Sequence, residues 1–218
     1  MKQIIDFNTW ERKSNFEFFA GFANPCVNIT CEVCCGNARE AAHRRKESFF
    51  IYYLYAIMEA VNRIEAFRYR LDNEGRIVLY DKIDVYVPVK DNTGGFTTVR
   101  VPFDYDFTRF YEAARAQIAG VSEHDPYSVE NAESETDTVV VSAVPKLPFT
   151  SVTCTLKSDR GNDYPLFAVG QLTADNKLPI AACVHHGFVD GEHLAQFYER
   201  IRQTLALLPI EEDRLLHA

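Results

Sequence analysis

The segment that most constrains this chain is residues 49–64, where hydrophobic side chains cover most of the circumference of a predicted helix. Its longest uncharged apolar stretch, Phe49 to Met58, is about half as long as a membrane-spanning helix needs to be. A helix of this kind has to be covered by protein on nearly every side. We therefore expect a buried core helix, with Ser48 at its N-cap position.

Short β-type runs and further helical patterns surround this segment. Strands are predicted over residues 26–33, 76–80, 84–89, 97–101, 138–144, 150–156, 166–173 and 178–186. Other helices are predicted over 10–19, over 38–46 with Asn37 as cap, from Asp106 to Ala119, and from Asp190 onward. Because strands and helices do not alternate strictly, we expect an α/β (α+β) two-layer sandwich, with a mostly antiparallel mixed sheet and helices packed on one side.

Composition limits the classes of partner. The 218 residues are 47% hydrophobic, which suits a single domain over residues 1–218. There are 31 acidic and 23 basic side chains, so the net charge is −8. Without a run of Lys or Arg, neither nucleic acid nor a membrane is expected as a partner. The N-terminus lacks the apolar stretch of a secretory signal, which predicts a cytoplasmic protein with its six cysteines reduced.

The segment most informative about chemistry is His185-His186-Gly187-Phe188-Val189-Asp190-Gly191, between a predicted strand and the last helix. Successive strand residues point to opposite faces, so His186 shares a face with Val184 while His185 points away. A neutral imidazole accepts a proton from a hydroxyl and later returns it. Two alternatives stay open at this point. The histidines and Asp190 could merely end a strand and cap a helix, or they could bind a metal ion.

Several separated motifs together resemble the chloramphenicol acetyltransferase family over the whole chain. They are Trp10 to Lys13 with Phe16 to Phe18, Pro25-Cys26, the 48–62 helix, Val141 to Pro145, and residues 185–191. The HHxxxDG pattern alone also occurs in other coenzyme A-dependent acyltransferases and in condensation domains. The order, spacing and length of the motifs make the resemblance specific.

The resemblance implies the coenzyme A-dependent acyltransferase fold and transfer of acetyl from acetyl-CoA to a hydroxyl of chloramphenicol or a related small molecule. This activity is associated with antibiotic resistance and needs no metal. His186 would be the general base, and Ser142 would stabilise the oxyanion of the tetrahedral intermediate. Arg12 would hold Asp190 through a bidentate contact that fixes the catalytic turn. The family also assembles as a homotrimer with active sites at the subunit interfaces.

Two positions depart from the family pattern in the acceptor pocket. Ala168 stands where the family usually has a threonine that holds a water molecule, and Phe19 stands where a tyrosine is typical. Both departures remove a hydroxyl group, and the loss at Phe19 would alter how the acceptor is oriented. They motivate the hypothesis that transferase chemistry is kept while the preference for the acceptor has shifted.

Four alternative interpretations follow from other features. The trimeric core of 2-oxoacid dehydrogenase acyltransferases shares the HxxxDG element, but no lipoyl domain is present in the chain. A trimer that binds hydrophobic small molecules without turnover is compatible with Phe19 and Ala168. The cysteines at 31, 34 and 35 contain a CxxC pattern but lack a second pair for zinc. The acidic segment 122–137 is expected to be solvated surface, although a regulatory contact remains open.

Overall fold

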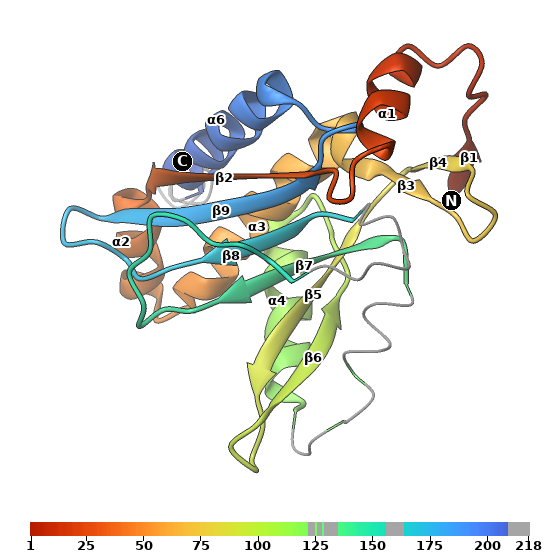
Figure 1. The fold of residues 1–218 in the computed structure, drawn as a ribbon. Coiled ribbons are helices and arrows are strands. Elements are labelled where there is room, and N and C mark those ends of the chain that lie inside the picture. Colours follow the sequence, from red (N-terminus) through yellow and green to blue (C-terminus); the bar gives the residue numbers. More distant parts are fainter. Residues whose placement is uncertain (122–124, 126–127, 129–134, 156–163, 209–218) are drawn as a thin grey trace, which may run out of the picture.

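The computed structural model describes residues 1–121, 125, 128, 135–155 and 164–208. A mixed sheet forms one layer, and helices lie behind it in the second layer (Figure 1). The helices of that layer are α2 (Gly36–Arg45), α3 (Phe49–Arg63), α4 (Phe107–Ala119) and α6 (Gly191–Leu207). A shorter helix, α1 (Lys13–Ala20), lies apart from them beside the chain that links the sheet to α6 (Figure 1).

The main sheet has six strands. In spatial order they are β2 (Cys26–Cys34), β9 (Lys177–His185), β8 (Leu166–Val169), β7 (Thr138–Ala143), β5 (Asp84–Lys90) and β6 (Phe96–Val101). β7 runs parallel to β5 and β8, and the other neighbours are antiparallel. The predicted two-layer fold with a mostly antiparallel mixed sheet is therefore confirmed.

A second, three-stranded antiparallel sheet lies beside the first (Figure 1). Its strands, in spatial order, are β1 (Lys2–Ile4), β4 (Ile77–Tyr80) and β3 (Tyr69–Leu71), and a 3-10 turn over Glu65–Arg68 precedes β3. Residues 73–75, an Asn-Glu-Gly sequence typical of a turn, lie between β3 and β4. Gly75 adopts a φ of 73°, a conformation that glycine takes without steric cost, and the Asp72 carboxylate accepts the Arg76 N–H at 2.9 Å.

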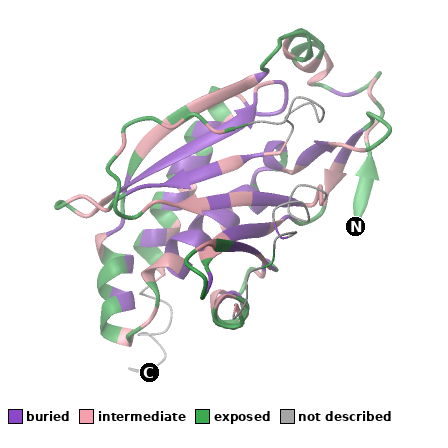
Figure 2. Ribbon diagram, turned by 60° about the horizontal axis from the view of Figure 1, so that its bottom comes forward, coloured by how far each residue is buried: buried purple, intermediate pink, exposed green. Residues whose placement is uncertain are grey.

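The core lies between the main sheet and α3, as the buried residues of Figure 2 show. Leu54, Ile57 and Met58 are fully buried, which confirms the core helix. One polar residue of α3, Asn62, is also buried. Its Nδ2 donates to the Met58 and Ile83 carbonyls at 2.9 Å, and its Oδ1 accepts the Ile83 N–H at 2.8 Å. Asn62 therefore joins α3 to the start of β5 without leaving a polar group unpaired.

Several local predictions are wrong. Residues 150–155 form no strand, because β7 pairs directly with β8 and β8 with β9, which leaves no place between these strands. Residue 156 lies outside the described residues. α2 begins at Gly36 with Cys35 at the N-cap, so Asn37 is inside its first turn. Ser48 occupies the N-cap of α3, but its side chain makes no capping hydrogen bond. Most of the acidic segment 122–137 lies outside the described residues.

No helix within the described ranges is long and apolar enough to cross a membrane.

Candidate active site

The two histidines at the end of β9 have different surroundings. His185 is 3% exposed and stacks on Phe16 of α1, with ring centroids 5.4 Å apart. The next residue, His186, is only partly buried and stacks on Phe19 of the same helix, with centroids 4.1 Å apart and ring planes at 24°. Of the two, only His186 is therefore accessible to a substrate.

Hydrogen bonds fix the tautomer of His186. Its Nδ1 lies 3.1 Å from the Val189 carbonyl oxygen, and its backbone N–H donates to the Pro25 carbonyl at 2.9 Å. Because a carbonyl oxygen only accepts, Nδ1 must carry the proton. Nε2 then holds a lone pair and is available as a base.

His185 is a structural residue. Its Nδ1 accepts the Gly187 N–H at 3.0 Å, which tightens the turn that follows β9. Burial lowers the pKa of His185 to about 4, because the charged imidazolium would be cut off from water. The ring is therefore neutral at physiological pH and stays in the core.

Protein stability should consequently fall between pH 6.5 and pH 4 because of His185. An unfolded histidine takes up a proton near pH 6.5, whereas this folded one does so near pH 4. The contribution is fully present above pH 6.5 and is lost as the pH falls, by roughly 3 kcal/mol. Thermal unfolding across this range should depend less on pH in His185→Asn, which keeps an acceptor for Gly187. The exposed residue His43 gives a control, His43→Asn, and equal pH dependence in all three proteins would contradict this role.

Arg12 and Asp190 meet across the catalytic turn. Arg12 precedes α1, and its Nη1 donates to Asp190 Oδ2 at 3.0 Å while its Nε donates to the Gly187 carbonyl at 3.4 Å. The Arg12 side chain is 13% exposed. The prediction of a bidentate contact is therefore wrong. The guanidinium donates one hydrogen bond to the Asp190 carboxylate and one to the Gly187 carbonyl.

Asp190 also begins α6. Its Oδ1 accepts the backbone N–H groups of Glu192 at 3.1 Å and His193 at 3.3 Å. Partial burial alone would raise the pKa of Asp190, but hydrogen bonds from His193 and Arg12 hold the pKa below its usual value. Asp190 is therefore an anion that anchors Arg12 and caps the helix.

Ser142 and Ala168 lie on the sheet face that points away from the helices. They are in register on β7 and β8, and side chains in register share a face. Their neighbours Val141 and Phe167 point the other way, into the core between the sheet and the helices. Ser142 is partly exposed on its face.

Within one chain, Ser142 lies far from His186. Ser142 is in register with Ala168, which is in register with Ala181 of β9, and Ala181 precedes His186 by 186 − 181 = 5 residues. Two strand spacings and five residue rises give a separation of roughly 19 Å. The two predicted catalytic side chains therefore do not converge on one substrate atom within a single chain.

The cysteine cluster does not form a site. Cys35 is buried, its Sγ donates to the Asn176 carbonyl at 3.2 Å, and burial raises its pKa to about 11. Cys34 is exposed, while Cys31 packs against the core from β2. The CxxC thiols thus point to different surroundings. No group of three or more potential metal ligands occurs in the described part of the chain.

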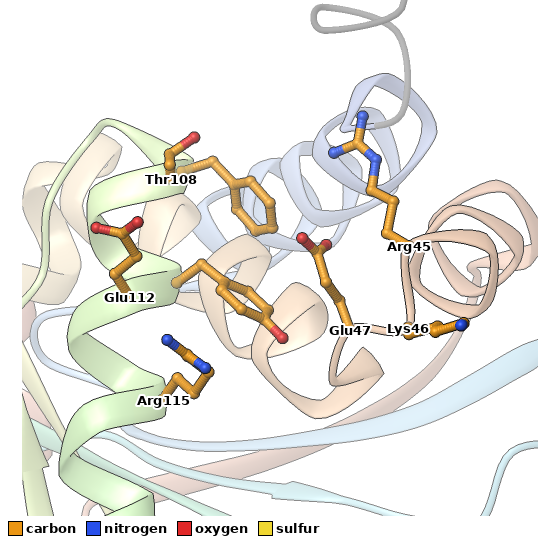
Figure 3. A pocket seen from close by; sticks show the side chains of 8 residues that line it. Arg45, Lys46, Glu47, Thr108, Glu112 and Arg115 are labelled. Carbon is orange, nitrogen blue, oxygen red and sulfur yellow. The ribbon is translucent and has the colours of Figure 1, made fainter.

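Two hollows on the surface of the described residues lie away from His186 and Ser142. One, of about 310 Å³, lies between the end of α2 and α4, with Glu47, Glu112 and Arg115 around it (Figure 3). Another, of about 400 Å³, lies beside the start of α2. In the first, Glu47 accepts a hydrogen bond from the Tyr52 hydroxyl, so this carboxylate already has a partner. Neither hollow includes His186 or Ser142.

Sequence reasoning missed two groups that hold the site. The Val189 carbonyl, which fixes the His186 tautomer, has no side-chain signal. His193 completes a capping box with Asp190. An Asp followed three residues later by a polar side chain at a helix start is the signal that could have identified His193.

Comparison with known proteins identifies the family. The family model for chloramphenicol acetyltransferase matches residues 2–202. The chain is 23% identical to a chloramphenicol acetyltransferase of Staphylococcus aureus, over 93% of this chain and 95% of that protein. It is 27% identical to one from Campylobacter coli, over 92% of this chain and 97% of that protein.

Solved structures give the same result. A chloramphenicol acetyltransferase structure superposes with a TM-score of 0.88 at 46% identity and covers 94% of this chain and all of its own. A probable dihydrolipoamide acetyltransferase from Listeria monocytogenes shares only the fold, with a TM-score of 0.60 at 12% identity over 93% of this chain and 94% of its own. Because the family model spans nearly the whole chain, this protein belongs to the chloramphenicol acetyltransferase family.

Proposed function

We propose that this protein is an acetyl-CoA-dependent O-acetyltransferase that acetylates a hydroxyl of chloramphenicol or a related small molecule. The names of its relatives from Staphylococcus aureus and Campylobacter coli support the reaction. The observation that carries the proposal is the bond from His186 Nδ1 to the Val189 carbonyl, which leaves Nε2 as a base. The whole chain, residues 1–218, acts as one acyltransferase domain in the cytoplasm.

In this mechanism, His186 Nε2 removes the proton from the acceptor hydroxyl as its oxygen attacks the thioester carbonyl of acetyl-CoA. The attack forms a C–O bond and a tetrahedral intermediate with a negative oxygen. The intermediate collapses by breaking the C–S bond, and the protonated His186 returns its proton to the departing coenzyme A thiolate. Both substrates are bound together, so no acetyl group passes through the protein.

Ser142 would donate its hydroxyl hydrogen bond to the oxyanion, which exists only near the transition state. Because Ser142 lies roughly 19 Å from His186 within one chain, we place the two in different subunits that face each other. A homotrimer with an active site at each interface satisfies this arrangement. Each interface would combine His186 of one copy with Ser142 of the next.

The remaining predicted residues would position the base and the acceptor. Arg12 and Asp190 would keep the turn after β9 in place, since Arg12 bridges the Asp190 carboxylate and the Gly187 carbonyl. Phe19 covers one face of the His186 ring and would line the acceptor pocket next to the base. Ala168, in register with Ser142, would leave that part of the pocket without a hydroxyl.

The test is to incubate the protein with acetyl-CoA and chloramphenicol and to identify products by mass, because the six thiols would react with a thiol-sensitive dye. The expected result is acetylated chloramphenicol with release of coenzyme A. If chloramphenicol is unchanged, a panel of hydroxyl-bearing acceptors of different shape should reveal the preferred one. Tight binding of such compounds without any acetyl transfer would favour the alternative of a non-catalytic binding trimer.

A further inference from the structure

We propose that His193 is a positioning residue of this acetyltransferase, which holds the Val189–Asp190 peptide group that orients His186. The inference rests on the proposed function for its kinetic consequences. His193 lies in the first turn of α6 and has no part in the chemistry described above.

The contacts of His193 converge on Asp190. Its Nδ1 lies 2.8 Å from Asp190 Oδ1 and 3.3 Å from the Asp190 backbone nitrogen. Arg12 donates to the other oxygen, Oδ2, at 3.0 Å. Asp190 is therefore held from two directions, by Arg12 through one carboxylate oxygen and by His193 through either the other oxygen or the backbone N–H.

A single rigid peptide group connects His193 to His186. The Val189 carbonyl and the Asp190 N–H belong to the same peptide group, which is planar. The carbonyl oxygen of this group lies 3.1 Å from His186 Nδ1, and its N–H points to His193 Nδ1. A rotation of this plane would move the carbonyl away from His186. His193 therefore restrains the group that fixes the tautomer and orientation of the base.

His193 holds Asp190 whether or not Nδ1 carries a proton. With a proton on Nδ1, His193 donates to Asp190 Oδ1, and 2.8 Å is a normal length for a charge-assisted bond. Without that proton, Nδ1 accepts the Asp190 N–H. Holding Asp190 therefore requires a polar atom at the Nδ1 position. The variants that test the proposal either keep or remove such an atom.

Three substitutions separate positioning from a simple loss of bulk. Asparagine places its side-chain amide near the position of histidine Nδ1, glutamine reaches the position of Nε2, and alanine reaches neither. We expect His193→Ala and His193→Gln to lower kcat about tenfold, because small misplacement of a catalytic group is costly. KM for both substrates should change less than about twofold, and His193→Asn should restore most of kcat. His43→Asn, at an exposed histidine of α2, is the control and should match the wild type.

A second measurement, which does not depend on enzymatic activity, is NMR of histidine side chains labelled with 15N. In the wild type and in His193→Asn, His186 should show one tautomer, with the proton on Nδ1. In His193→Ala and His193→Gln, its nitrogen signals should move towards the average of the two tautomers. If wild-type protein transfers no acetyl group but these spectra differ as described, the proposed function fails while the role of His193 stands. Unchanged His186 signals, or wild-type kcat in His193→Ala and His193→Gln, would overturn the proposal.

Discussion

His186→Ala should lower kcat for acetyl transfer by roughly 10³-fold, within the range that a positioned general base contributes. The alanine side chain has no group that accepts the hydroxyl proton. The fold should persist, because His186 is partly exposed and the bond from its backbone N–H to Pro25 does not need the ring. The measurement is the rate of product formation at saturating acetyl-CoA, followed by product mass.

His43→Ala serves as the control for this experiment, because it removes an imidazole on the outer surface of α2. Its rate should equal that of the wild type. A His186→Ala protein with activity within tenfold of the wild type would exclude His186 as the base. Binding of coenzyme A and chloramphenicol should be retained in the variant, which shows that chemistry rather than binding was lost.

Two inactive variants should restore each other when they are assembled into mixed trimers. His186→Ala removes the base from one side of each interface, and Ser142→Ala removes the oxyanion donor from the other, at a cost of about 10²- to 10³-fold. If the two are unfolded and refolded together in equal amounts, about one quarter of the interfaces should combine an intact His186 with an intact Ser142. Activity should therefore rise from nearly zero to about one quarter of the wild-type value.

The matched control is a chain that carries both substitutions, refolded with His186→Ala. No interface in that mixture holds an intact His186, so activity should stay at the level of His186→Ala alone. If the mixture of single variants were no more active than its components, although mass measurements showed mixed trimers, then His186 and Ser142 would not act across an interface. Such a result would contradict the placement of the active site between subunits.

Much of this architecture could be predicted because the local sequence patterns agree with the contacts that the residues make in the folded protein. The 49–64 helix was predictable from its apolar circumference, since burial on nearly all sides leaves few alternatives. Asp106 and Asp190 both cap helices as predicted, because a carboxylate that accepts backbone N–H groups is a local interaction. The turn at Gly75 was predictable for the same reason.

Other features depend on contacts that the sequence does not encode locally. Residues 150–155 alternate like a strand, yet β8 takes the place beside β7, and these residues join neither of the edges at β2 and β6. Within the candidate site, the pattern at the end of the last predicted strand indicated His186 and Asp190, and the family resemblance added Arg12. The division of Arg12 between Asp190 and the Gly187 carbonyl could not be predicted, because it depends on the backbone of the turn. The distance between Ser142 and His186 likewise follows only from strand order and register.

The most direct test asks whether the acetyl group passes from acetyl-CoA to chloramphenicol in one step, with His186 as the base. It uses acetyl-CoA with a 13C-labelled acetyl group and follows the masses of chloramphenicol and of the protein in the same reaction. The proposed mechanism predicts that the label appears in chloramphenicol, that this requires His186, and that the protein never carries the label. A labelled protein that passes its acetyl group to chloramphenicol would show an acyl-enzyme. That result would contradict the role of His186 as a base that activates the acceptor.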